Sequence, residues 1–418
     1  GADAIFKGVA LPGMPNVHSH AFQYALSGLA ETYGGEEGDF WTWRTMMYDF
    51  TSKVSPEDAE AIAAKLYLEM IKAGYTSIGE FHYLHHDQGG AKYENPAEMS
   101  LAVNRAADQA GISQTMLPVL YQYSDFGKQP RTDHQARFYH STDHFLGLLE
   151  ILDKKLANSP QHNLGMAFHS LRAVDVSEIK SVTDHMTSRF PEAPIHIHIA
   201  EQVKEVEACL LYSQKRPVEY LMDMNVVDDR WTLIHATHVN DDEVSKITER
   251  QAVAGICPTT EANLGDGIFP AAYFKNKGGH LAMGSDSHVT IDPFDELRLY
   301  EHGQRLKHLK RGVSGNDQMT DVGAYTWHQA VQGGGHSLKG ERGLIEEGNK
   351  ADIIVLDPDC DALYAKPKEK RVSSLVFTSL ARKITDVIVQ GQHVLEDGYH
   401  SNEESIQKAW RKVMKKYQ

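Results

Sequence analysis

Two histidines, His18 and His20, follow an apolar stretch near the beginning of the chain. Residues two apart on an extended strand point to the same face, so these imidazoles are expected to lie side by side. Two imidazoles at the C-terminal end of a strand provide half of a Zn²⁺ site. The chain contains 23 His, so roughly one such pair is expected by chance. The prediction therefore depends on whether other strands end in the missing ligands.

Three later apolar segments also end in candidate ligands. In Ile195–Glu201 we expect His198 at the rim to bind the metal and His196 to be a buried structural residue. In Trp231–His238, His235 is expected to face the interior of the barrel that the strand and helix pattern predicts (see below), while His238 lies either behind the site or in a loop. The segment His280–His288 supplies Asp286 at the same rim. His18, His20, His198 and Asp286 are thus the predicted metal ligands.

Such a set of ligands predicts metal-assisted hydrolysis. Three His and one Asp can bind one Zn²⁺, which lowers the pKa of a bound water from 15.7 toward ~7. Asp286 can then accept the water proton, His235 can orient the hydroxide, and Glu201 can carry a proton to the departing nitrogen. The segment Asn163–Leu171 lacks the lysine that bridges two metals in many related hydrolases. One metal is therefore predicted, with a two-metal amidase as an alternative, and Fe²⁺ suits the same ligands.

Eight apolar, β-rich segments recur along the chain. Most are separated by helix-patterned stretches, of which the first is capped by Ser55 and runs to Ala73. The other predicted helices are Pro96–Ala110, Ser141–Asn158, Ser177–Arg189, Gln202–Ser213 and Asp241–Arg250. Alternating strands and helices predict a parallel sheet, and eight such units predict a (β/α)₈ barrel of the TIM type. A doubly wound open sheet is the alternative, although no Gly-x-Gly-x-x-Gly follows an early strand. The segments are Leu11–His20, Thr76–Leu84, Gln114–Gln122, Asn163–Leu171, Ile195–Glu201, Trp231–His238, Ala252–Thr260 and His280–His288.

Other segments lie outside this repeat. Residues 21–55, which include Phe40-Trp41-Thr42-Trp43-Arg44, form a long connection that is either a wall or lid over the site or simple surface packing. After Gly340, a turn and strand precede a hairpin around Gln390-Gly391 and a helix at Glu403–Lys416. We therefore expect a small β-sandwich-like domain from 1–10 and 341–400, a barrel from 11–340, and a C-terminal helix from 401–418. Either that sandwich is small or residues preceding this numbering complete it.

The composition narrows the possible partners. The 418 residues carry a net charge of −15, which disfavours nucleic acid and anionic membranes as partners. No apolar run approaches the ~20 residues of a membrane span, and no signal peptide is apparent. Three scattered cysteines, Cys209, Cys257 and Cys360, favour a reducing compartment and hence the cytoplasm. An anionic substrate would need a local cluster of arginines.

The motifs of this chain resemble those of the amidohydrolase superfamily and, within it, the formimidoylglutamate deiminase subfamily. The superfamily motifs, which cover most of the chain, specify only a hydrolase. The subfamily is indicated by Trp43-Arg44, Phe81-His82-Tyr83 and His169-Ser170-Leu171-Arg172. The other resembling segments are Leu11–Gln23, His196–Glu201, His235–His238, Thr260–Phe269 and Ser285–His288.

The resemblance implies hydrolysis of N-formimidoyl-L-glutamate to N-formyl-L-glutamate and ammonia in histidine degradation. It implies the same metal ligands, with His235, Glu201 and Asp286 in catalysis, and a homodimer. It also implies substrate contacts from Gln23, Arg44, Tyr83, His169 and Arg172. Two carboxylates on the substrate require planar, bidentate donors, which agrees with Arg44 and Arg172. The alternatives are a superfamily deaminase acting on a purine, pyrimidine or triazine ring, and a non-catalytic relative.

Overall fold

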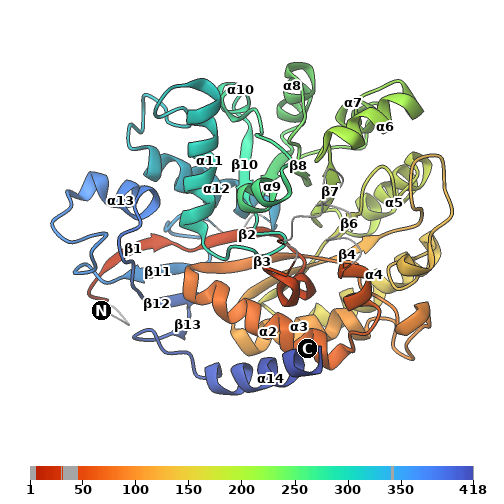
Figure 1. Cartoon of the computed structure of the whole chain (residues 1–418), viewed down its shortest axis with the longest axis horizontal. Helices are drawn as coiled ribbons and strands as arrows, with labels where there is room; N and C mark the ends of the chain where they lie inside the picture. Colours follow the sequence, from red (N-terminus) through yellow and green to blue (C-terminus); the bar gives the residue numbers. More distant parts are fainter. Residues whose placement is uncertain (1–5, 30, 32–45, 340–342, 418) are drawn as a thin grey trace.

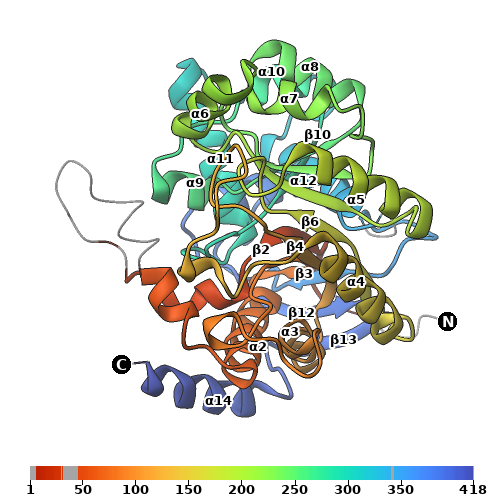
Figure 2. The same cartoon turned by 90° about the vertical axis from the view of Figure 1, so that its right-hand side faces the viewer.

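The computed structural model describes residues 6–29, 31, 46–339 and 343–417. Its largest feature is a parallel barrel with eight strand positions, surrounded by helices (Figures 1 and 2). The predicted (β/α)₈ fold is therefore confirmed. In order around the barrel, the strands are β2 (Met14–Ser19), β3 (Tyr75–His82), β4 (Ser113–Leu120), β5 and β6 (His162–Leu164 and Met166–Phe168), β7 (Ile195–Ile199), β8 (Trp231–His235), β9 (Val253–Ile256) and β10 (His280–Met283).

All eight predicted segments contain a barrel strand, and each strand ends before its predicted segment does. Three of the differences have a local structural cause. The first segment divides at Gly13, and residues Val9–Pro12 form β1 in a separate sheet. A Cβ on Gly13 would lie 2.2 Å from Thr76 Cγ2, so only glycine allows this close approach. The fourth is interrupted at Gly165. The seventh ends at Ile256, because Pro258 begins helix α9 (Pro258–Leu264) in the position where proline is favoured.

The connecting helices cover the outside of the barrel (Figure 2). Ser55 caps α2 as the sequence predicts, since its Oγ accepts from Asp58 N at 3.2 Å and the Asp58 carboxylate accepts from Ser55 N. The predicted helices are observed as α2 (Pro56–Ala73), α3 (Glu98–Ala110), α4 (Thr142–Leu156), α5 (Val176–Arg189), α6 (Val203–Ser213), α8 (Asp241–Glu249) and α14 (Glu403–Lys416). Further helices are α7 (Pro217–Met222), α10 (Ala271–Asn276), α11 (Pro293–His308), α12 (Val322–Ser337) and α13 (Arg371–Phe377), and short 3₁₀ turns occupy Ala21–Leu26, Gln88–Gly90, Asp133–Gln135 and Lys368–Lys370.

The barrel closes between its first and last strands, along what we call the closing seam of β2 and β10. In the described residues this seam has a single β-bridge, between Ser19 and Asp286. Its backbone bonds are Asp286 N to His18 O at 3.0 Å and His20 N to Asp286 O at 3.4 Å. Helix α12 packs directly over the seam, and a Cβ on its Gly333 would lie 2.0 Å from Leu281 O. Glycine there lets the helix lie almost against the strand backbone.

A second, four-stranded antiparallel sheet lies beside the barrel, in the order β1, β11 (Ile353–Leu356), β12 (Ile384–Val389) and β13 (Gln392–Leu395). The predicted hairpin at Gln390-Gly391 is confirmed, with both residues at positive φ. Strand β1 continues to Pro12, beyond the expected boundary at residue 10, and the boundary expected at 340–341 lies outside the described residues.

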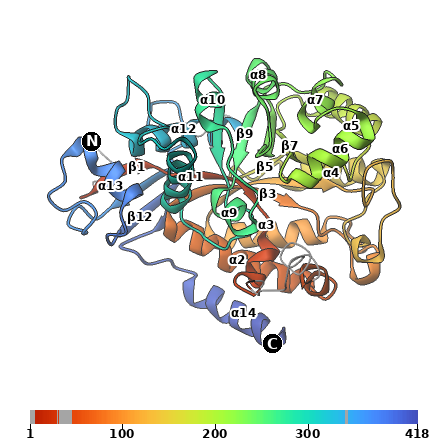
Figure 3. The same cartoon turned by 45° about the horizontal axis from the view of Figure 1, so that its top comes forward.

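Helix α14 lies along the outer side of α2 (Figures 1 and 3). The Tyr417 hydroxyl donates to Asp58 Oδ2 at 2.7 Å, and Lys416 pairs with the same carboxylate. The aromatic rings of Tyr24 and Trp410 pack at 5.2 Å between centroids. In the part of the chain that the structure describes, no helix has the length and apolar character needed to cross a lipid bilayer.

Candidate functional site

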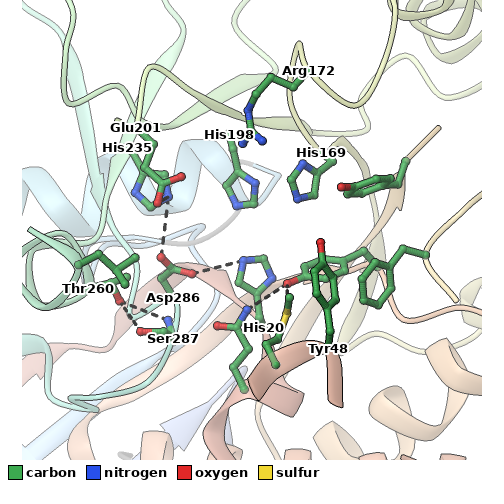
Figure 4. Close-up of a pocket in the computed structure, with 16 residues that line it drawn as sticks. His20, Tyr48, His169, Arg172, His198, Glu201, His235, Thr260, Asp286 and Ser287 are labelled. Atoms are coloured by element: carbon green, nitrogen blue, oxygen red, sulfur yellow. Dashed lines mark hydrogen bonds and ion pairs between the residues drawn. The ribbon is translucent and has the colours of Figure 1, made fainter. Parts of the chain in front are cut away.

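The predicted metal ligands lie together at the C-terminal mouth of the barrel, where Figure 4 shows His20, His198 and Asp286. His18 Nε2 lies 2.9 Å from His198 Nε2, which comes from β7 on the far side of the barrel. Asp286 Oδ1, just after β10, lies 3.6 Å from His18 Nε2 and 3.3 Å from His20 Nε2. All four side chains are buried. The structure therefore brings together the four residues that sequence analysis selected.

The protonation of these histidines suits a divalent cation. Burial and the neighbouring histidines hold the pKa of His18 well below its usual value, and burial lowers the pKa of His20 to about 3. Nδ1 of His20 lies 2.9 Å from Phe81 O, so this nitrogen carries the ring proton and Nε2 keeps a lone pair facing Asp286. Neutral imidazoles directed at one carboxylate are donors that Zn²⁺ and similar ions accept. The residues present fit a metal ion.

His235 lies next to this group and is surrounded by carboxylates. Its Nε2 lies 3.7 Å from Glu201 Oε1 and 3.8 Å from Asp286 Oδ2, and its Nδ1 lies 3.3 Å from Glu261 Oε1. Burial alone would lower the pKa of His235, but these acids outweigh burial and raise it to about 10. Burial raises the pKa of Asp286 to about 7, with Glu201 and Glu261 adding to the effect. His235 therefore stays protonated near neutral pH, whereas the Asp286 carboxyl can exchange a proton there.

The backbone turns sharply where three of these strands end. Ala200, His235, Ala236 and Asp286 all have positive φ, between +47° and +69°. A left-handed conformation costs a residue with a Cβ roughly 1–2 kcal/mol, and such residues cluster at functional sites. Here they turn the chain at the rims of β7, β8 and β10 beside the ligands. Sequence analysis missed this feature because none of the four positions is a glycine.

A cavity of about 100 Å³ opens above the predicted ligands. Gln23, Tyr83, His169 and Arg172, which were predicted to contact substrate, all line it. Arg44 lies outside the described residues. The cavity is also lined by residues that sequence analysis did not select, namely Met47, Tyr48, Tyr121, Phe138, Thr260, Leu264 and Ser287.

The predicted substrate contacts form one side of this cavity. Gln23 Nε2 donates to the Tyr83 hydroxyl at 3.0 Å, and the Tyr83 ring packs against His20 and His169. Arg172 points toward the cavity beside His198 and His169 (Figure 4). Burial would lower the pKa of Arg172, but nearby Glu205, Tyr121 and Glu201 outweigh burial and raise it. A permanently charged guanidinium thus lies on a cavity otherwise rich in aromatic rings.

The wall opposite Arg172 includes part of the long connection between β2 and α2. Met47 and Tyr48 line the cavity, while the predicted Trp41 and Trp43 lie outside the described residues. The buried Arg137 guanidinium holds this segment by donating to Thr51 O and, at 2.9 Å, to Val54 O. The described part of this connection is therefore a wall of the cavity.

Sequence analysis also missed several buried residues around the site. Glu261 contacts His235. Glu80 accepts a hydrogen bond at 2.7 Å from the Oγ of Ser19, the residue between His18 and His20. Both lie inside or beside the family-like segments quoted above, and an acid in an apolar strand is itself a signal. His196 and His238 are structural, because their Nε2 atoms contact Ser337 O at 3.2 Å and Asp266 O at 2.7 Å, respectively.

The fold and this mouth define a (β/α)₈ barrel with a histidine and carboxylate site of the kind that metal-dependent hydrolases use. The sequence profile of the amidohydrolase family matches residues 9–394. The chain belongs to the amidohydrolase family, whose members are metal-dependent.

Individual relatives are similar over nearly the whole chain. Formimidoylglutamate deiminase from Pseudomonas aeruginosa is 45% identical over 407 residues, which cover 97% of this chain and 89% of that protein. The crystal structure of an amidohydrolase from Brucella melitensis superposes with a TM-score of 0.92 at 43% identity, covering 98% of this chain and 89% of the other. A zinc-bound adenosine deaminase from Xanthomonas campestris shares the fold, with a TM-score of 0.79 at 21% identity over 98% and 86% of the two chains.

Proposed function

We propose that this chain hydrolyses N-formimidoyl-L-glutamate to N-formyl-L-glutamate and ammonia, a reaction of histidine degradation. The observation that carries this proposal is the partly buried Arg172 on a cavity beside the predicted metal ligands. The 45% identity to a formimidoylglutamate deiminase over 97% of the chain supports the same substrate. We also propose that the protein works in the cytoplasm as a homodimer.

The proposed cofactor is one Zn²⁺ per chain, with Fe²⁺ as an alternative, held by His18, His20, His198 and Asp286. When bound, such an ion lowers the pKa of water from 15.7 toward ~7. Strands β5 and β6 carry no lysine that could bridge a second ion, which favours a single metal.

The residues of the chain then move protons. Asp286 directs Oδ1 at the histidines and Oδ2 at His235, so Oδ2 is free to take a proton from the attacking water. His235 Nε2, between Glu201 and Asp286, holds the water oxygen in line with the formimidoyl carbon. As the oxygen–carbon bond forms, Glu201 gives its proton to the terminal nitrogen and then takes the remaining proton of the added hydroxyl. Asp286 gives the proton that it accepted to the same nitrogen, the carbon–nitrogen bond breaks, and ammonia leaves, so that water supplies the two hydrogens gained overall.

The substrate carboxylates are assigned to arginines. A guanidinium binds a carboxylate through two parallel hydrogen bonds, and Arg172 presents such a group to the cavity. Arg44 is proposed for the second carboxylate. Gln23, Tyr83 and His169 form the surface between Arg172 and His20, where they orient the rest of the substrate.

Ammonia release tests the proposal directly. The protein, loaded with one equivalent of Zn²⁺, is assayed with N-formimidoyl-L-glutamate and with a panel of amino-purines, amino-pyrimidines and amino-triazines. We expect turnover of the linear amidine and little of the rings. Turnover of a ring alone would overturn the assignment.

A ring deaminase is the second candidate because the cavity has four aromatic walls, Tyr48, Tyr83, Tyr121 and Phe138. Such rings could stack on a planar heterocycle. The deaminases of 5-methylthioadenosine and S-adenosylhomocysteine are more distant relatives, with that of Natronomonas pharaonis 25% identical over 93% of this chain and 82% of its own length. A ring substrate would leave the charge of Arg172 unused, which favours the dicarboxylate.

A further inference from the structure

We propose that a one-directional hydrogen-bond chain of Asn16, Ser285, His288, Ser19 and Glu80 positions the metal ligands across the closing seam. This inference rests on the metal site of the proposed function. It adds five positioning residues that do not themselves touch the ion or the substrate.

The chain crosses the seam through consecutive short contacts between buried side chains. Asn16 Nδ2 lies 2.6 Å from Ser285 Oγ, and Ser285 Oγ lies 3.0 Å from His288 Nδ1. His288 Nε2 lies 3.1 Å from Ser19 Oγ, which in turn lies 2.7 Å from Glu80 Oε2. All five residues are 1% exposed or less. Two residues come from β2, one from β3, and two follow β10.

The side-chain amide of Asn16, the first group of the hydrogen-bond chain, has only one possible orientation. Asn16 Oδ1 accepts from two backbone groups, His18 N at 3.2 Å and Ser285 N at 3.1 Å. The amide nitrogen of Asn16 must therefore face Ser285 Oγ and donate to it.

The other end is an acceptor only. Glu80 accepts from Ser19 Oγ, from the Tyr67 hydroxyl at 2.9 Å and from Ala21 N at 2.8 Å. Three donors converging on one carboxyl are satisfied by a carboxylate. Burial raises the pKa of Glu80 to about 7 against these donors, so the experiments below are made at pH 8, where the carboxylate predominates. Ser19 must then donate its single proton to Glu80.

Because Asn16 must donate at one end and Glu80 must accept at the other, the position of every proton between them is determined. Ser19 Oγ, having used its proton, accepts from His288 Nε2–H, so His288 Nδ1 carries the lone pair. Ser285 Oγ accepts from Asn16 and donates to that lone pair. The geometry thus assigns His288 to the Nε2–H tautomer.

The location of the hydrogen-bond chain explains how it positions the metal ligands. The closing seam has a single β-bridge among the described residues, so backbone pairing contributes little to its register. Asn16 and Ser19 lie within two residues of His18 and His20, and Ser285 and His288 lie within two residues of Asp286. The side-chain bonds therefore replace the missing ladder and fix the spacing between the ligands of the first strand and the ligand that follows the last.

Two single variants each interrupt the direction of hydrogen-bond donation while keeping the shape of the side chain. In Glu80→Gln the new NH₂ group faces the donors Ser19 and Tyr67, and in Asn16→Asp the amide donor to Ser285 is lost. Removing partners of metal ligands typically costs 10–100-fold in metal affinity, so we expect 10–100-fold faster loss of Zn²⁺ to a chelator.

The matched control is Glu301→Gln. Glu301 is equally buried and accepts from Val313 N at 3.2 Å and Ser314 N at 2.9 Å, but it lies on α11, away from the ligands. We expect it to keep Zn²⁺ as the wild type does. Equal zinc loss in Glu301→Gln and Glu80→Gln would overturn the inference.

The double variant Asn16→Asp/Glu80→Gln provides the decisive measurement. The amide introduced at position 80 then donates to Ser19, and Ser19 donates to His288 Nε2. His288 Nδ1–H donates to Ser285, and Ser285 donates to the carboxylate introduced at position 16. The hydrogen bonds from position 16 to position 80 then all run in the opposite direction with each group of the relay paired; the Tyr67 hydroxyl, outside the relay, loses its acceptor at position 80 as it does in Glu80→Gln alone. We expect zinc loss to return to within about threefold of wild type, whereas independent effects would simply multiply. Multiplied losses would refute the proposal.

The ring nitrogens of His288 give a second readout, which is measured on the wild type. In ¹⁵N NMR spectra of the wild type, assigned by comparison with His288→Gln, we expect an Nε2–H tautomer. An Nδ1–H or doubly protonated ring would overturn the assigned direction of hydrogen-bond donation from Asn16 to Glu80. If the wild type binds neither Zn²⁺ nor Fe²⁺, the proposed function fails; if it binds Zn²⁺ and the variants do not alter its release, only this inference fails.

Discussion

Two clusters of buried or partly buried histidines lie on opposite faces of the same strand, β3. The mouth cluster consists of His18, His20, His198 and His235. The wall cluster consists of His82, His85, His86 and His140, behind the aromatic wall of the cavity. The Phe81 ring packs against His18, His20 and His198, whereas that of the next residue, His82, packs against His85.

Each cluster contains four histidines, but the two clusters differ in their neighbours. Three carboxylates, those of Asp286, Glu201 and Glu261, lie within 4 Å of ring nitrogens of the mouth cluster. In the part of the chain that the structure describes, no ion pair joins the wall cluster to a carboxylate, and no candidate metal group includes it. Histidine density alone therefore does not predict a metal site. The carboxylates that converge on the histidines do.

The largest expected effect separates the two clusters directly. His198→Ala removes a proposed ligand, so we expect zinc to be lost and ammonia release to fall by at least roughly 10³-fold. His140→Phe serves as the control, and it should retain one equivalent of zinc. Elemental analysis and the ammonia assay measure both properties. Zinc loss in both variants would show that the clusters do not differ as described.

A smaller effect is expected at the substrate side of the mouth. Arg172→Met removes charge-assisted hydrogen bonds worth about 1.5–3 kcal/mol each, so kcat/KM for the dicarboxylate should fall about 10²-fold or more. Zinc content should stay at the wild-type level, because Arg172 is not a proposed ligand. Unchanged kinetics would instead favour the ring-deaminase alternative.

The smallest effect concerns the acid stability of the wall cluster. Burial, with help from His86, His144 and Lys92, lowers the pKa of His140 to about 3, against 6.5 for an ordinary histidine. Between pH 6.5 and 3 the unfolded chain binds a proton there that the folded protein does not. The free energy of unfolding therefore decreases as the pH falls, by up to ~1.4 kcal/mol per pH unit from this residue.

His140→Phe tests this directly, because it removes the titrating ring. Both nitrogens of His140 are buried without a hydrogen-bond partner among the described residues, so phenylalanine costs no such bond. Urea unfolding from pH 7 to pH 4 should show a smaller loss of stability in the variant. An identical pH slope in the two proteins would contradict the assignment.

The sequence predicted the eight barrel strands, the capped helices and the metal ligands because each depends on local periodicity. Strand limits were wrong at Gly13, Gly165 and Pro258, where packing or backbone constraints end a strand within an apolar run. Glu80 and His288 could not be linked from sequence, since their contact with Ser19 depends on the register of the closing seam. The aromatic walls were missed for the same reason, because Tyr121 and Phe138 reach the cavity only through folding.

The single bridge of the closing seam has a consequence for how the protein is made. A nascent chain emerging from the ribosome carries His18 and His20 first and Asp286 only after the last barrel strand. The three come together when the two edges of the sheet join, which is the final long-range contact in the barrel. We therefore expect cation uptake at full affinity only after the segment through Asp286 has been synthesised, and a bound ion would then link the two edges.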